Sequence, residues 1–216
     1  SFLPCAVISA GALDNNCSQS GACKNSSVKQ GEGWSFNSES GELVISNDKA
    51  MDYYYGGKGT RSPWFAFRQK ITKVIINPGV TKIGAYAFYS CRRLESISIP
   101  DSVTEIGGAS FKGCENLKSV NIPNKVIRIE EYAFAWCDNL ESVNIPSSVT
   151  DIGEGAFSSC ANLESINIPG SVTDIGEYAF SYCTKLRCVT IANGVVSIRR
   201  GAFTCESLES ISIPDS

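Results

Sequence analysis

A period of 23 residues runs through most of this chain. Phenylalanine, cysteine and leucine each recur at this step, and the last unit has lost one residue between Phe203 and Cys205. The recurring positions are Phe88, Phe111, Phe134, Phe157, Phe180 and Phe203; Cys91, Cys114, Cys137, Cys160 and Cys183; and Leu94, Leu117, Leu140, Leu163 and Leu186. A fixed period between about 20 and 50 residues is typical of a solenoid, because each unit buries its apolar face only against its neighbours. The sequence therefore predicts that equivalent residues stack over one another.

Each unit contains one segment that reads as a short strand. Ile97 and Ile99 alternate with Ser96 and Ser98, which is the period of two expected for a strand with one buried face. Proline follows at Pro100 and at the equivalent position of most units, and marks where strand pairing stops because it has no N–H to donate. Seven such segments, from 71–76 to 208–213, are predicted to pair in a parallel sheet.

The rest of each unit must carry the chain back across the other side. The stretch SVTEIGGASF has Val103, Ile106 and Phe111 as apolar anchors, and is too short and glycine-containing for a long helix. It predicts a second short strand or a single 3₁₀ turn. The glycine column in this stretch (Gly84, Gly107, Gly153 and Gly176) is interrupted by Glu130 and Arg199. A left-handed backbone is therefore not expected at that column.

The unit C-x-x-L-x-S-I-x-I-P-x-S-V-T-x-I-G-x-x-A-F resembles the BspA-type leucine-rich repeat, which is found in surface proteins of mucosal bacteria and protozoan parasites. The resemblance covers residues 71–216, about six repeats, and a similar lead-in extends it to roughly Gly33. It implies a leucine-rich-repeat solenoid of the α/β class that is strongly β-dominated. The lead-in is expected to form a β-rich cap within residues 13–70, since an open solenoid end would expose core and unpaired edge.

The two ends of the sequence suggest a piece of a longer chain. The first residue is Ser1, and the closing IPDS begins a unit that is not completed, so the array is expected to be truncated at its C-terminal end. Residues 1–12 are either the remnant of a secretory signal, within the apolar stretch 3–13, or a strand of the cap. Glycosylation sequons at Asn16 and Asn25 are compatible with secretion.

Ten cysteines raise the question of disulfides. Stacked equivalents in neighbouring units lie close enough for a disulfide, but their Cβ atoms point in parallel, which favours a column of reduced, buried thiols. Cys17 and Cys23 are predicted to form a cap disulfide if the chain is secreted, and Cys188 is expected to face outward as the reactive thiol. The cysteines show no paired C-x-x-C spacing and the chain has no histidine, so no metal site or cofactor is expected.

Composition argues against several functions. The net charge is −3 and the sequence has no basic run, so the electrostatic signature of a nucleic-acid-binding protein is missing. The longest apolar stretch is too short for a transmembrane segment. Catalysis through a Ser–His or Cys–His pair needs a histidine. The column of Glu95, Glu141, Glu164 and Glu209 is better explained as a solvated strand edge than as glycosidase carboxylates, so no enzymatic activity and no catalytic residues are expected.

Two surfaces remain as binding candidates. The first, which we name the edge rings, is a row of aromatic residues along one lateral edge: Tyr86, Tyr89, Tyr132, Trp136, Tyr178 and Tyr182. These rings either face solvent and dock a protein or sugar, or pack down and seal the core. The second, the polar strip, is a column of small residues on the outer strand face: Ser96, Ser119, Asn121, Ser142, Asn144, Ser165 and Asn167. It is either a solvated ladder or a groove for a glycan or an extended protein segment.

The resemblance implies adhesion, with a matrix or cell-surface protein or a glycan as the extracellular partner. The sequence thus predicts a secreted or cell-surface, non-enzymatic recognition module. A structural spacer that presents a downstream domain, or a carbohydrate-binding module, is the alternative.

Overall fold

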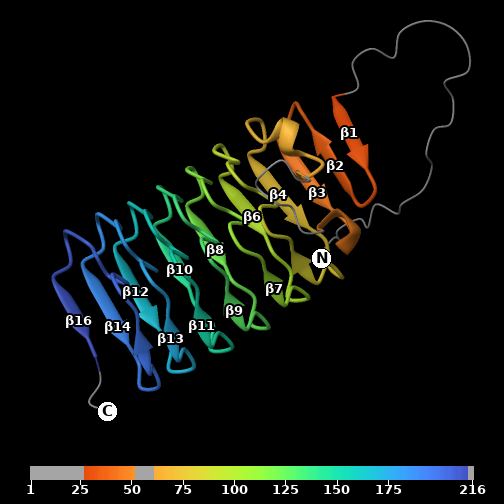
Figure 1. Cartoon of the computed structure of the whole chain (residues 1–216). Helices are drawn as coiled ribbons and strands as arrows, with labels where there is room; N and C mark the ends of the chain where they lie inside the picture. Colours follow the sequence, from red (N-terminus) through yellow and green to blue (C-terminus); the bar gives the residue numbers. More distant parts are fainter. Residues whose placement is uncertain (1–26, 52–60, 214–216) are drawn as a thin grey trace, which may run out of the picture.

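The computed structural model describes residues 27–51 and 61–213. Figure 1 shows these residues as a stack of flattened coils, which runs from β1–β3 at one end to β16 at the other. Each coil has a strand on one side and a shorter return strand on the opposite side. The predicted β-dominated solenoid is confirmed.

The longer strands form the first side of the stack. They are β4 (Lys73–Ile76), β6 (Ser96–Ser98), β8 (Ser119–Asn121), β10 (Ser142–Asn144), β12 (Ser165–Ile168), β14 (Cys188–Ile191) and β16 (Ser210–Ser212). Paired strands are parallel and in register, so that Ser119 lies beside Ser142 and Asn121 beside Asn144. The seven predicted strands are present. Their hydrogen-bonded ladder is interrupted between β6 and β8 and between β10 and β12, although the neighbouring strands still lie side by side (Figure 1).

The return strands form the second side, and there the ladder is unbroken. The strands are β5 (Lys82–Ile83), β7 (Glu105–Ile106), β9 (Arg128–Ile129), β11 (Asp151–Ile152), β13 (Asp174–Ile175) and β15 (Ser197–Ile198). The prediction of a second short strand is confirmed.

Glycine brings successive units close together beside the return strands. A Cβ added to Gly107 would lie 2.5 Å from the backbone nitrogen of Ala85, and one on Gly153 would lie 2.7 Å from that of Glu131. Neither glycine has a positive φ, as predicted. The side chain is absent at these positions because of close backbone approach rather than backbone conformation.

The core is a column of stacked phenylalanines with a column of thiols beside it. The rings of Phe111, Phe134 and Phe157 are fully buried, and the ring centroids of successive residues lie 5.1 and 5.3 Å apart. The Cys137 thiol donates to the carbonyl oxygen of Phe111 at 3.4 Å, and the Cys160 thiol donates to that of Phe134 at 3.3 Å. The column cysteines are free thiols, as predicted.

The N-terminal cap takes the place of a preceding unit. It contains the antiparallel strands β1 (Val28–Gly31), β2 (Trp34–Asn37) and β3 (Glu42–Ile45), followed by the 3₁₀ turns η1 (Asp48–Met51) and η2 (Phe65–Phe67). Strand β3 pairs in parallel with β4 and so supplies the first strand of the stack. The expected β-rich cap is therefore present.

Several predictions fall on residues outside the described part of the chain. These are the signal remnant at 1–12, the sequons at Asn16 and Asn25, and the Cys17–Cys23 disulfide. The domain boundaries at 13, 70 and 71 stay predictions.

Candidate binding surface

The lateral edge of the stack has a regular backbone that sets where its side chains point. The residue two before the phenylalanine adopts a left-handed backbone conformation in each of the six units, and the residue two after it does so in every unit except the last. Left-handed φ values occur at Tyr86, Ala109, Tyr132, Gly155, Tyr178 and Gly201 before phenylalanine, and at Ser90, Gly113, Trp136, Ser159 and Tyr182 after it. Because of these left-handed residues, three backbone N–H groups of one unit donate to backbone carbonyls of the next. The N–H groups of Tyr132, Phe134 and Trp136 each donate at 2.8 Å, to the carbonyls of Glu154, Ala156 and Ser158. The edge is therefore a third hydrogen-bonded ladder, which holds its side chains in fixed positions.

Aromatic and small residues alternate along this edge. The units of Phe134 and Phe180 have aromatic side chains at both left-handed positions, whereas the intervening unit has Gly155 and Ser159. A left-handed backbone is easily adopted by glycine and costs other residues on the order of 1–3 kcal/mol. The aromatic residues thus occupy positions that glycine would fill with less strain. This conformation was not predicted from the sequence, although glycine recurs at the same positions in other units, at Gly113, Gly155 and Gly201.

The tyrosines before phenylalanine pack down onto the next unit. A Cβ on Gly155 would lie 2.4 Å from a ring carbon of Tyr132, and one on Gly201 would lie 2.6 Å from the ring of Tyr178. The Tyr132 hydroxyl donates to the carboxylate of Glu154. This hydrogen bond, helped by burial, raises the pKa of Tyr132 to about 12. Tyr132 and Tyr178 therefore seal the edge more than they display it.

The rings after phenylalanine project into solvent. Trp136 is 50% exposed and Tyr182 is 65% exposed. The ammonium nitrogen of Lys112 lies 4.6 Å from the centroid of the Trp136 ring and 4.7 Å from that of Tyr132. Tyr86 and Tyr89 are half-buried and meet edge to face, with centroids 5.7 Å apart. Both alternatives predicted for the edge rings therefore occur. The rings before phenylalanine pack down, whereas Trp136 and Tyr182 after it face solvent.

The polar strip lies on the outer face of the longer strands. Every residue predicted for it is exposed. Cys188 is exposed as well, in line with the prediction, and pairs with Ser165 and Ser210 on the neighbouring strands. The strip is flat and lacks aromatic side chains, which are the groups enriched at protein-binding hot spots.

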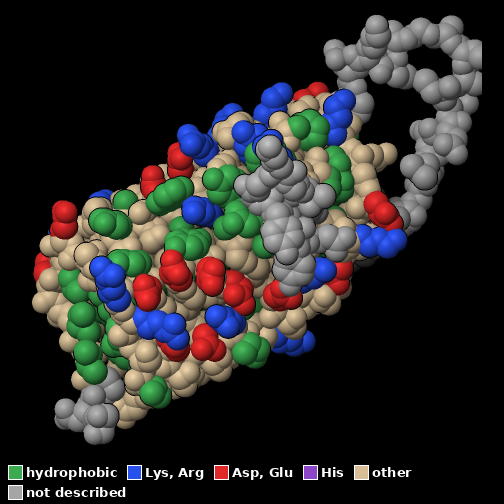
Figure 2. All heavy atoms as spheres, viewed as in Figure 1, with side chains coloured by type: hydrophobic (Ala, Val, Ile, Leu, Met, Phe, Trp, Pro, Cys, Tyr) green, Lys and Arg blue, Asp and Glu red, His purple; other side chains and the backbone are tan. Residues whose placement is uncertain are grey.

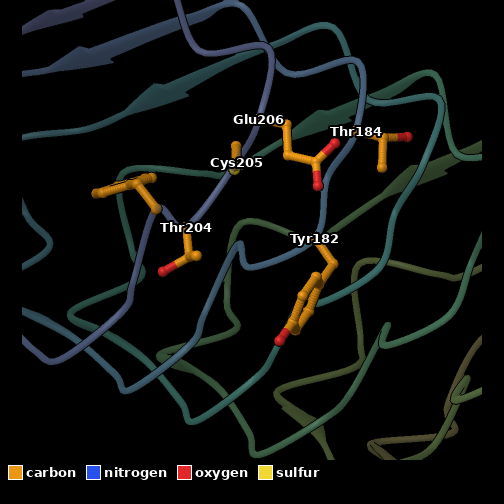
Figure 3. Close-up of a pocket in the computed structure, with 6 residues that line it drawn as sticks. Tyr182, Thr184, Thr204, Cys205 and Glu206 are labelled. Atoms are coloured by element: carbon orange, nitrogen blue, oxygen red, sulfur yellow. The ribbon is translucent and has the colours of Figure 1, made fainter.

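Two of the hollows in the described surface lie within the repeat array. One, of about 250 Å³, lies beside Tyr182 and is lined by Tyr182, Thr184, Phe203, Thr204, Cys205 and Glu206 (Figure 3). Tyr182 is the one lining residue that the sequence predicted as a binding candidate, although the missing residue between Phe203 and Cys205 was visible there.

The other hollow, of about 280 Å³, is lined by acidic and basic residues of the return strands. Figure 2 shows acidic and basic side chains interspersed on one face of the molecule. Arg199 pairs with the carboxylate of Asp174 at 2.6 and 3.0 Å in this second hollow. Within residues 27–51 and 61–213, no group of three or more His, Cys, Asp or Glu side chains could hold a metal ion.

The parallel stack, the 23-residue register and the buried phenylalanine column define a leucine-rich-repeat solenoid. The chain belongs to the family described as BspA type leucine-rich repeat region, which matches residues 61–183 and 104–216 in 6 copies. The predicted family resemblance is confirmed. None of the curated proteins matches the chain.

Solved leucine-rich-repeat proteins from bacteria resemble the chain. A protein from Bacteroides ovatus has 30% identity and a TM-score of 0.59 over 87% of this chain and 46% of its own. The Treponema pallidum protein TpLRR has 29% identity and a TM-score of 0.55 over 73% and 67%. A leucine-rich cell surface protein from Faecalibacterium prausnitzii has 26% identity and a TM-score of 0.51 over 80% and 56%. The chain therefore spans about half the length of two of these three proteins. The described residues contain no helix long and apolar enough to cross a membrane.

Proposed function

We propose that this chain is a non-enzymatic, secreted or cell-surface recognition module that binds a macromolecular partner through the edge rings, in an adhesive role. One observation carries the proposal: Trp136 and Tyr182 are half or more exposed although each has a strained left-handed backbone. Backbone strain persists where the surrounding structure enforces it, and it is enriched at binding sites. Large exposed aromatic rings are the side chains that contribute most to protein-binding hot spots.

Two further features support this proposal. The ladder of backbone hydrogen bonds fixes the rings before a partner arrives, so that little conformational entropy is lost on binding. Trp136 and Tyr182 are equivalent residues two units apart, so one extended partner could contact both and gain from multivalency. A location outside the cell is in keeping with the similar protein from Faecalibacterium prausnitzii, which is described as a cell surface protein.

The test exploits the strained backbone. Replacing both accessible rings with glycine (Trp136→Gly and Tyr182→Gly) removes the side chains and relieves the left-handed strain, so we expect the free energy of unfolding to change by less than about 1 kcal/mol. Binding to immobilised extracellular matrix proteins and glycans, followed by surface plasmon resonance, should fall at least tenfold for any molecule that the unmodified chain retains.

The matched control is a pair of substitutions on the polar strip, Asn121→Ala and Asn144→Ala. We expect this variant to bind as the unmodified chain does. Binding that is lost in the control and kept in the glycine variant would move the site to the strand face. A chain that retains none of the matrix proteins or glycans would contradict recognition and favour the spacer.

A further inference from the structure

The hollow beside Tyr182 exists where the repeat is broken. In the preceding units two residues separate the phenylalanine from the cysteine, and the second of them has the left-handed conformation. The last unit passes from Phe203 through Thr204 directly to Cys205. The residue that would stand next to Tyr182 in the following unit is therefore missing. The space of about 250 Å³ is left between the two units.

Apart from the Tyr182 hydroxyl and the Cys205 thiol, which donates to the carbonyl of Phe180, the polar side chains around this hollow can accept hydrogen bonds. The Thr204 hydroxyl donates its proton to the carbonyl of Gly201 at 3.1 Å, and the Thr184 hydroxyl donates to that of Ala161 at 3.3 Å. The oxygens of both hydroxyls are left to accept, as is the carboxylate of Glu206. Figure 3 shows the Glu206 carboxylate directed toward the side of the hollow where Tyr182 lies. An ammonium group, with three donors and no acceptor, matches such a lining.

The charge of Glu206 is not compensated by any described side chain. In the same column two units are linked by an ion pair, in which the Arg92 guanidinium lies 3.1 Å from the carboxylate of Glu115. The residue that precedes Glu206 in this column is Thr184, which has no charge. No cation among residues 27–51 and 61–213 forms an ion pair with Glu206. A cation supplied by a partner would fill the role that Arg92 has for Glu115.

The chain itself shows that this edge accepts cations against its rings. Lys112 places its ammonium against the rings of Tyr132 and Trp136, and the pair Tyr178 and Tyr182 repeats that arrangement 46 residues later. Ser158 takes the position of Lys112 there, so the second pair has no lysine of its own, and the Arg200 guanidinium lies 6.0 Å from the centroid of the Tyr178 ring. A desolvated ammonium near an aromatic ring gains a cation–π interaction.

We propose that the hollow between Tyr182 and Glu206 binds a lysine side chain of a protein partner. The lysine methylenes would pack on Phe203, and the ammonium would lie between the Tyr182 ring and the Glu206 carboxylate and donate to the threonine oxygens. This inference rests on the proposed function, since it names the chemistry that one part of the edge recognises.

The test uses the unmodified, isotope-labelled chain and a lysine peptide, acetyl-Gly-Lys-Gly-amide. We expect the peptide to shift the NMR signals of the Thr204, Cys205 and Glu206 amides, with a millimolar dissociation constant that rises with salt. The peptide with norleucine in place of lysine has the same stem without the charge, and should bind at least fivefold more weakly. Equal binding of the two peptides, or no shift with either, would overturn the inference.

Variants then assign the site. Glu206→Gln should weaken the lysine peptide at least threefold, and Tyr182→Ala should weaken it two- to fivefold. Glu209→Gln is the matched control, because that carboxylate of the same unit already pairs with Arg187 at 3.3 Å and lies outside the hollow. Insertion of one serine between Thr204 and Cys205 restores the period and should abolish binding while the circular dichroism spectrum is unchanged. Binding of the lysine peptide that is as tight with the insertion, or with Glu206→Gln, as with the unmodified chain would overturn the inference.

The two proposals fail separately. If the lysine peptide does not bind but Trp136→Gly and Tyr182→Gly still remove matrix-protein binding, the lysine site is contradicted and the proposed function is supported. If the peptide binds and the chain retains no macromolecule, the lysine site is supported and the proposed function is contradicted.

Discussion

At the scale of single residues, each core side chain is stabilised by its own copies in neighbouring units. The Phe111 ring stacks between Phe88 and Phe134, and its carbonyl accepts from the backbone of Cys114 and from the thiol of Cys137. Burial raises the pKa of the column thiols, to about 12 for Cys91. A thiol with a raised pKa remains protonated at neutral pH and reacts slowly, since the thiolate is the nucleophile.

This difference between thiols is testable by alkylation. We expect iodoacetamide at pH 8 to modify the exposed Cys188 in the native chain, while Cys114, Cys137 and Cys160 react only after unfolding in urea. The pH lies below the raised pKa of the buried thiols, so both their protonation and their burial protect them. Peptide mass spectrometry measures each site. Native-state labelling of Cys137 as fast as that of Cys188 would contradict the packed column.

The structural role of a residue could be predicted from the sequence where the residue follows the 23-residue period. The buried phenylalanine, cysteine and leucine columns were predicted from spacing alone, because one unit reports on all the others. The left-handed backbone at Tyr132 and Trp136 was not predicted, because the glycine column that suggests a positive φ lies at another position of the repeat and is interrupted. The edge rings could be named from the sequence as a group, but their division into packed and exposed members depends on Gly155 and Gly201 in the following units.

At the scale of elements, the cap ends each of the three ladders with a different device. Strand β3 continues the longer strands, and the Asp48 carboxylate accepts the backbone N–H and the hydroxyl of Thr81, each at 2.7 Å. On the lateral edge the Trp64 ring stacks on Phe88 with centroids 5.7 Å apart, and its Nε1 donates to the carbonyl of Ala87 at 2.8 Å. Trp64 thereby supplies both the ring and the N–H of a missing unit.

Replacing the Trp64 indole with a smaller ring that has no N–H tests this role of the cap. Trp64→Phe leaves the buried Ala87 carbonyl without that partner, so we expect it to lower the free energy of unfolding by about 1–3 kcal/mol. Trp34→Phe is the control, because that half-buried indole packs beside Trp64 at 6.2 Å without ending the ladder, and should cost less than about 1 kcal/mol. Urea denaturation measures both. Equal stabilities of the two variants would contradict the account of Trp64 as the end of the ladder.

The longer strands of the repeat could be predicted from alternation, whereas the return segment was predicted as either a second short strand or a single 3₁₀ turn. The capping role of Trp64 could not, because it stands 24 residues before Phe88 and so lies outside the period. The interruptions beside β8 and β12 likewise have no counterpart in the sequence pattern.

At the scale of the whole molecule, the stack is a regular scaffold and its candidate binding features are departures from strict repetition. The exposed rings occur in alternate units, and the hollow beside Tyr182 occurs where one residue is missing. The sequence alone indicated Tyr182 and the missing residue separately. It could not bring them together with Glu206, because the hollow depends on how the shortened unit follows the one before it.

The most direct test of recognition through the lateral edge is site-specific photocrosslinking to a matrix protein or glycan that the unmodified chain retains. The photoreactive residue p-benzoylphenylalanine replaces Trp136 in one variant, Tyr182 in a second and Asn144 on the polar strip in a third. We predict crosslinks from positions 136 and 182 and none from position 144. Crosslinks from position 144 alone would contradict the account and place the partner on the strand face.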